Sequence, residues 1–127
     1  MKTLIYILSA LVFIICITSC KKKQKTYRTV TVEEFSNEIA GNNIQIVDVR
    51  TPEEYQDGNI SGSINIDIND NRFAERAHEL LDTAKTIAIY CRSGRRSKKA
   101  ADILSKQGYN IIELDGGFIS WVKAGKQ

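Results

Sequence analysis

The 127-residue chain contains little proline, histidine or cysteine: one, one and three residues respectively. A single proline excludes a proline-rich linker. Three cysteines without a C-x-x-C motif, together with one histidine, exclude a zinc finger and a thioredoxin-type dithiol. The length allows one domain and excludes a two-domain or repeat architecture. With 43% hydrophobic and 26% charged residues, the chain is expected to bury a core.

The net charge of +3 is too small to indicate nucleic-acid binding, and it is unevenly distributed. Residues 1–28 hold six basic residues and no acidic residue, whereas residues 29–127 hold 12 basic and 15 acidic residues. The sequence therefore predicts a mildly acidic domain behind a basic N-terminal arm, with no nucleic-acid partner.

The arm begins with an apolar run over residues 4–17, which only Ser9 and Ala10 interrupt. A helix of this length would measure about 21 Å, short of the roughly 30 Å core of a bilayer. The run has no polar face, so an ordinary buried helix is disfavoured. Its length is typical of a secretory signal peptide.

The end of the run, Ile17-Thr18-Ser19-Cys20, resembles the lipobox of bacterial lipoproteins. This resemblance implies cleavage before Cys20 and lipidation of that residue, and the alternatives are an uncleaved membrane anchor or a plain signal peptide. We therefore expect a lipoprotein signal peptide over residues 1–19, a lipidated cysteine with a basic tether over residues 20–28, and one domain over residues 29–127. The protein would be exported, anchored in a membrane through its lipid and facing the periplasm.

This interpretation leaves Cys91 as the one free thiol, because Cys16 leaves with the signal peptide and lipid occupies Cys20. An internal disulfide is then excluded. A lone thiol in an oxidising compartment is a liability unless it has a use.

The domain alternates apolar strand patterns with helical patterns. Capping boxes begin at Thr31 and Thr51, and glycines follow the expected helices. The expected helices cover residues 31–40, 52–57, 72–81 and 97–107 and a final segment after residue 117. The expected strands cover residues 44–49, 64–66, 86–90 and 111–114. This alternation predicts an α/β fold with a mainly parallel sheet and helices on both faces.

Cys91 follows the clearest strand and precedes a helix, at the edge of the sheet where ligands bind in open parallel sheets. The loop contains Gly94, and five cations lie close together without an acidic residue: Arg92, Arg95, Arg96, Lys98 and Lys99. Positive surroundings and a helix N-terminus favour the thiolate, which is the nucleophile. The alternative is a buried strand-end cysteine beside a basic helix face, and Lys98 and Lys99 are interpreted as a solvated face in either case.

Four ordered segments resemble the signatures of rhodanese-like domains and together cover about residues 30–122. They are Val47-Asp48-Val49-Arg50, residues 54–66, Tyr90-Cys91-Arg92-Ser93-Gly94-Arg95-Arg96-Ser97, and Leu114-Asp115-Gly116-Gly117-Phe118 with Trp121. The resemblance implies a rhodanese-like fold with a central five-stranded sheet. Asn59 departs from the histidine that is common in the family, at a position that is usually structural.

The resemblance implies sulfurtransferase chemistry through a persulfide on Cys91, without a metal or an organic cofactor. The loop Arg92, Ser93, Gly94, Arg95 and Arg96 would bind the substrate, with backbone N–H groups around the outer sulfur and arginines on the donor's sulfonate. The arginine-rich loop favours an anionic donor, either thiosulfate or a persulfide. The acceptor would be a small thiol, cyanide or a protein thiol, and we expect a monomer.

Two other functions compete with sulfur transfer. A cysteine-dependent phosphatase needs C-x₅-R, but the sixth residue after Cys91 is Ser97. A membrane-anchored persulfide carrier or partner-binding module, with little turnover of its own, remains the alternative. Outside the loop, Asp48 and Arg50 are expected to form a structural pair, His78 to lie on the surface and Trp121 to lie in the core.

Overall fold

The computed structural model describes residues 27–127, and the sheet at its centre has five strands in the order β1-β5-β4-β2-β3. The strands are β1 (Tyr27–Val30), β2 (Ile44–Asp48), β3 (Ile64–Asn65), β4 (Thr86–Tyr90) and β5 (Asn110–Leu114). Every pair of neighbouring strands is parallel. The predicted α/β fold is confirmed, and the sheet is wholly rather than mainly parallel.

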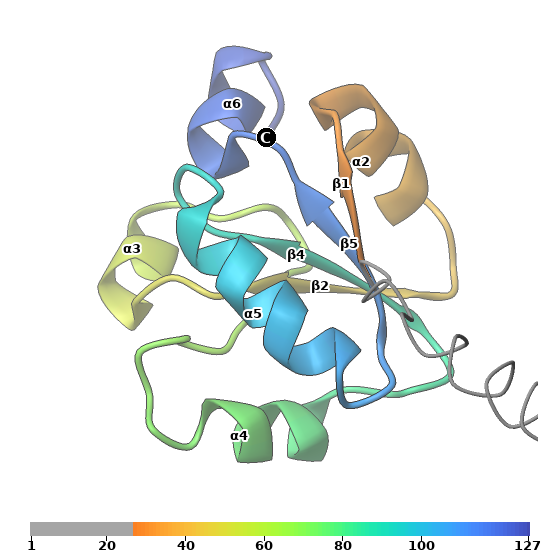
Figure 1. Cartoon of the computed structure of the whole chain (residues 1–127). Helices are drawn as coiled ribbons and strands as arrows, with labels where there is room; N and C mark the ends of the chain where they lie inside the picture. Colours follow the sequence, from red (N-terminus) through yellow and green to blue (C-terminus); the bar gives the residue numbers. More distant parts are fainter. Residues whose placement is uncertain (1–26) are drawn as a thin grey trace, which may run out of the picture.

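Helices cover both faces of this sheet, as predicted (Figure 1). They are α2 (Val32–Ile39), α3 (Pro52–Asp57), α4 (Phe73–Leu80), α5 (Arg95–Ser105) and α6 (Gly117–Lys123). Helices α4 and α5 pack on one face, and α2 and α6 pack on the other. Helix α3 follows β2, so it lies at the carboxyl edge of the sheet where the cysteine loop also lies.

The two predicted capping boxes are present. Thr31 caps α2 and Thr51 caps α3, each accepting a backbone N–H from the glutamate three residues later. Glu34 and Glu54 return the bond to the backbone N–H of the capping threonine. These local bonds satisfy N–H groups that have no partner within the helix.

The structure corrects two boundaries. Tyr27 and Arg28 begin β1 and pair with Ile111 and Ile112, whereas the sequence interpretation placed both in the tether. Helix α5 begins at Arg95, two residues before its predicted start. The signal peptide, Cys20 and the rest of the proposed tether lie outside the described residues.

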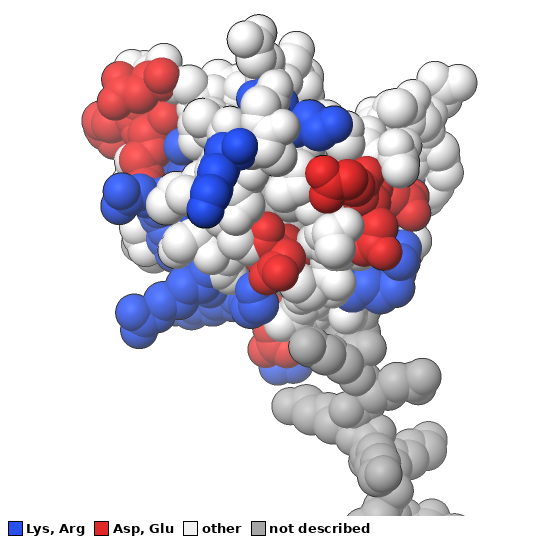
Figure 2. Space-filling model, turned by 90° about the horizontal axis from the view of Figure 1, so that it is seen from above, with Lys and Arg blue, Asp and Glu red and all other residues white. Residues whose placement is uncertain are grey.

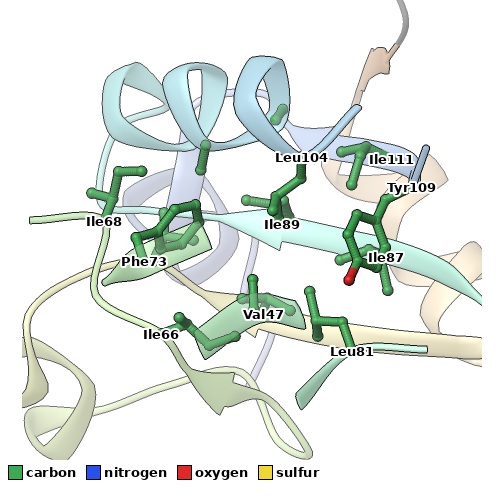
Figure 3. Close-up of a cluster of buried hydrophobic side chains, with 14 of the residues drawn as sticks. Val47, Ile66, Ile68, Phe73, Leu81, Ile87, Ile89, Leu104, Tyr109 and Ile111 are labelled. Atoms are coloured by element: carbon green, nitrogen blue, oxygen red, sulfur yellow. The ribbon is translucent and has the colours of Figure 1, made fainter. Parts of the chain in front are cut away.

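The larger part of the core lies between the sheet and helices α4 and α5 (Figure 3). Figure 3 labels Val47, Ile66, Ile68, Phe73, Leu81, Ile87, Ile89, Leu104, Tyr109 and Ile111. Cys91 belongs to the same buried cluster. The thiol is therefore held by a packed layer and not by a mobile surface turn.

A second cluster lies under α2 and α6, where Phe35 meets Trp121 edge-on with ring centroids 6.1 Å apart. Trp121 is 3% exposed, as expected for a core residue, and His78 is exposed on α4, also as expected. Within residues 27–127, the helices are too short or too polar to cross a membrane.

Candidate active site

Cys91 directly follows β4, and its side chain is almost completely covered, with 1% exposed. The backbone N–H of Gly94 donates to Cys91 Sγ over 3.1 Å. Gly94 can aim its N–H at the sulfur because its φ is +103°, a left-handed conformation that favours glycine. The loop therefore curls around the sulfur as the sequence predicted.

Helix α5 points its N-terminus at this loop. Its first N–H groups, those of Arg95, Arg96 and Ser97, have no carbonyl partner within the helix. The positive end of the helix favours negative charge near Cys91. Because Arg95 and Arg96 are helical, the free loop consists of Arg92, Ser93 and Gly94 only.

Helix α6 fixes the loop from the other side. The N–H of Phe118 donates to the carbonyl of Cys91 over 2.8 Å, and the N–H of Ile119 donates to the carbonyl of Arg92 over 3.0 Å. Gly117 allows this approach, since a Cβ there would lie 2.6 Å from backbone atoms of Cys91 and Arg92. Gly117 of the last signature thus has a physical role in holding the cysteine loop.

The guanidinium of Arg96 is already paired with a carboxylate. Its two terminal nitrogens donate to the carboxylate oxygens of Glu54 on α3, over 2.7 and 2.8 Å. The hydrogen bonds from Arg96 lower the pKa of Glu54 to about 2, although partial burial opposes the shift. The same pair raises the pKa of Arg96. The expectation that all loop arginines form an uncompensated cationic spot is therefore wrong for Arg96, whose charge is matched.

Arg92 and Arg95 are exposed, and neither forms an ion pair within residues 27–127. Arg92 lines a hollow of about 190 Å³ beside the loop, with Phe118 and Ile119 from α6 and Asp57 and Gly58 from the end of α3. Seen from above in Figure 2, Lys and Arg side chains lie between clusters of Asp and Glu. The surface is thus mixed in charge, and the free cations at the loop are few.

Asp48 and Arg50 form the expected structural pair. Arg50 Nη2 lies 2.6 Å from Asp48 Oδ2, and both side chains are buried. Burial by itself would lower the pKa of Arg50, but the hydrogen bond and charge of Asp48 raise it. The guanidinium also donates to the carbonyl of Gly58 and lies 4.4 Å from the centre of the Phe118 ring. This pair joins β2, α3 and α6 behind the loop.

The sequence reasoning missed a buried polar group on the α5 side of Cys91. Ser97 Oγ lies 3.4 Å from Cys91 Sγ and donates to Glu113 Oε1 over 2.6 Å. Ser97 and Glu113 are both fully buried. A signal was available, since Glu113 is the one charged residue in the otherwise apolar strand Ile111-Ile112-Glu113-Leu114.

A protein-family model for the rhodanese-like domain matches residues 31–124 of this chain. The chain belongs to the rhodanese-like domain family. The resemblance of the four sequence signatures is thereby confirmed. The rhodanese-like domain of this chain holds no group of three His, Cys, Asp or Glu side chains, within residues 27–127, that could bind a metal ion.

Three similar proteins illustrate the relationship. Over 120 residues, the chain is 36% identical to the uncharacterized protein YqhL of Bacillus subtilis, covering 93% of this chain and 90% of YqhL. It is 42% identical over 72 residues to the thiosulfate sulfurtransferase PspE of Escherichia coli, covering 56% and 67% of the two chains. The crystal structure of a rhodanese-related protein from Thermoplasma volcanium superposes with a TM-score of 0.71 at 34% identity, covering 80% of this chain and 96% of that one.

Asn59, the position where this rhodanese-like domain departs from the family pattern, has a structural contact. Its side-chain amide donates to the carbonyl of Tyr55 over 3.0 Å, at the end of α3. The next residue, Ile60, donates its N–H to the buried hydroxyl of Tyr90. The segment after α3 is therefore fastened to β4, and Asn59 takes part in that turn rather than in the cysteine loop.

Proposed function

We propose that this rhodanese-like domain is a sulfurtransferase that carries a sulfane sulfur on Cys91. The observation that carries the proposal is the position of Cys91 Sγ, which accepts the Gly94 N–H at the N-terminus of α5. Preorganised N–H groups stabilise negative charge that develops on a reacting atom. The name of the relative PspE, a thiosulfate sulfurtransferase, supports the same chemistry.

The reaction has two displacement steps. The Cys91 thiolate attacks the outer sulfur of thiosulfate, the S–S bond of the donor breaks, and sulfite leaves with the electron pair. Cys91 then holds a persulfide, whose terminal sulfur carries one negative charge. An acceptor thiolate or cyanide attacks that terminal sulfur, and the Cys91 thiolate is the leaving group. Both steps balance without an external oxidant or cofactor.

The geometry around Cys91 suits the transfer of a single atom. Because Cys91 is only 1% exposed, a reagent or donor reaches the sulfur through the mouth of the loop, with its reacting atom in front. The donor's sulfonate would stay outside, where the unpaired cations Arg92 and Arg95 can bind it. Ser93 and Gly94 would contribute backbone N–H groups, and Arg96 would act mainly by holding the start of α5, next to the loop, against Glu54 on α3.

The deciding experiment is mass spectrometry of the purified protein after exposure to thiosulfate. We expect an adduct of one sulfur atom on Cys91, removed by cyanide, and no adduct in the Cys91→Ser variant, because a serine hydroxyl cannot hold a persulfide. Steady-state formation of thiocyanate would then establish turnover. An adduct without turnover would favour the persulfide carrier, and absence of any adduct would overturn both.

We also propose that the domain is exported and anchored as a lipoprotein through Cys20. The proposal rests on the motif Ile17-Thr18-Ser19-Cys20 after a short apolar run. Several acyl chains bury enough CH₂ groups to anchor a protein, at about 0.8 kcal/mol each. Cell fractionation should find the wild type in membranes, whereas Cys20→Ala should remain an unprocessed precursor. A soluble wild-type chain that begins elsewhere would contradict the anchor.

A further inference from the structure

Glu113 is a carboxylate in a place where an apolar side chain would be expected. It lies near the end of the internal strand β5, is fully buried, and faces the same side of the sheet as Ile111 and helix α5. Burying a charge costs several kcal/mol unless it is paired and hydrogen-bonded. Packing alone therefore does not explain a carboxylate at this position.

The partners of Glu113 come from three elements. Ser97 on α5 donates to Oε1 over 2.6 Å, and Thr29 on β1 donates to Oε2 over 2.9 Å. Lys98 Nζ, also on α5, lies 3.4 Å from Oε2, but its side chain is 43% exposed and thus partly solvated. The fourth neighbour is the loop after β4, because a Cβ added at Gly94 would lie 3.5 Å from Oε1.

The hydroxyl of Ser97 links this carboxylate to the thiol. A serine has one proton to donate, and Ser97 donates it to Glu113. Its oxygen is then an acceptor toward Cys91 Sγ, 3.4 Å away, so the thiol proton points at Ser97. The result is a continuous buried chain in which Cys91 S–H donates to Ser97 O–H, which donates to the Glu113 carboxylate.

We propose that Glu113 is a positioning residue that receives the thiol proton of Cys91 through Ser97. In this step the S–H bond breaks and its proton bonds to Ser97 Oγ, while the Ser97 proton moves to Glu113 Oε1. The thiol becomes a thiolate and the carboxylate becomes a carboxylic acid. This inference rests on the proposed function in one respect, that Cys91 is the nucleophile.

The exchange keeps the charge of the buried group constant. Before it, one negative charge lies on Glu113, and after it, the same charge lies on Cys91 beside the Gly94 N–H. The persulfide is also a monoanion, so a proton held on Glu113 prevents two negative charges from facing each other across Ser97. Like charges in a buried site are costly, and sharing one proton avoids that cost.

A role in charge alone makes the opposite prediction. If Glu113 acted only as a nearby negative charge, replacing it by glutamine would favour the thiolate and speed the reaction of Cys91 with iodoacetamide. If it accepts the proton, Glu113→Gln slows that reaction. The direction of the change therefore separates the two roles.

The first test measures the alkylation rate of Cys91 by iodoacetamide from mildly acidic to mildly alkaline pH. The wild type should show an alkylation rate that changes little with pH, because Glu113 and not the solvent accepts the proton of the thiol. In Glu113→Gln and Ser97→Ala the rate should be on the order of tenfold to a hundredfold lower at acidic pH. It should then rise about tenfold per pH unit as solvent removes the proton. The double variant should be no slower than the slower single variant.

The matched control is Glu75→Gln, which removes an exposed carboxylate on α4 and should keep the wild-type profile. Alkylation of Glu113→Gln at or above the wild-type rate would overturn the relay. If that variant does not fold, as judged by circular dichroism, Ser97→Ala decides by the same criterion.

The second test uses the wild type and needs no substitution. Infrared difference spectra before and after thiosulfate treatment should show the C=O band of a protonated carboxylic acid when the persulfide is present. A confirmed sulfur adduct without this band would overturn the relay and leave the proposed function standing. Absence of the adduct itself would instead overturn the proposed function.

Discussion

Asp48 and Glu113 are both fully buried at the carboxyl ends of strands, on opposite faces of the same sheet. Asp48 faces α6 and is held by the guanidinium of Arg50 through three side-chain hydrogen bonds. Glu113 faces α5 and accepts from two hydroxyl groups, and within residues 27–127 the half-exposed Lys98 is its one cationic partner. The first carboxylate is neutralised by a fixed charge, whereas the second can exchange a proton with a hydroxyl.

The sheet therefore supports two different tasks around Cys91, one on each face. On the α6 face, the fixed ion pair Arg50–Asp48 holds the backbone behind the loop. On the α5 face, hydroxyl groups connect a carboxylate to the sulfur. A guanidinium remains protonated at any pH of interest, so an Arg–carboxylate pair cannot take part in proton transfer. A serine hydroxyl can both give and accept a proton.

The largest effect is expected on the α6 face. Asp48→Asn leaves the buried guanidinium of Arg50 without its anion and should lower the free energy of unfolding by about 3–5 kcal/mol. Glu113→Gln should cost only about 1 kcal/mol, since an amide oxygen can still accept from Ser97 or Thr29. Urea denaturation of both variants measures the difference. Equal losses would contradict the contrast between a structural and a proton-exchanging carboxylate.

The next effect concerns the contact of α6 with the loop. Gly117→Ala should lower stability by about 2–4 kcal/mol, because φ is +61° and the new Cβ would overlap the backbone of Cys91 and Arg92. It should also reduce sulfur transfer, since the loop must move. Gly108→Ala is the matched control, with φ of +93° but nothing within 4 Å of the new Cβ. It should lose some stability and keep its transfer rate, and equal loss of activity would refute a specific loop contact.

The predictability of these features follows the distance in sequence between the groups involved. The capping boxes at Thr31 and Thr51 could be predicted because each joins residues three positions apart. Strand β1 was missed because it follows a lysine-rich arm and depends on pairing with β5. The bonds of Arg96 to Glu54, 42 residues away, could not be seen in a local pattern. Glu113 could be marked as unusual within its strand, but its link to Ser97 depends on how α5 packs.

The third effect concerns donor binding at the mouth of the site. Arg92→Ala should raise KM for thiosulfate if Arg92 makes a charged hydrogen bond to the donor. The rise should correspond to a loss of about 1.5–3 kcal/mol in binding free energy. The effect on an uncharged sulfur donor should be smaller. Arg96→Ala should change KM and kcat for both donors alike, because it releases the start of α5, next to the loop, from Glu54. A donor-selective effect from Arg96 and not from Arg92 would reverse these assignments.

The smallest effect is expected from the partly exposed pair of Arg96 with Glu54. Glu54→Gln should lower the free energy of unfolding by about 1 kcal/mol at neutral pH. The pKa of Glu54 is lowered from 4.5 to about 2 by Arg96 in the folded chain, so the carboxylate stabilises the fold above pH 4.5. This contribution should decline as the pH falls from 4.5 toward 2, and the stabilities of wild type and variant should converge there. Glu53→Gln, on the same helix but exposed, serves as the control with little change. A wild-type advantage that grows toward acidic pH would contradict the pairing, because a depressed pKa can only lose stability in that direction.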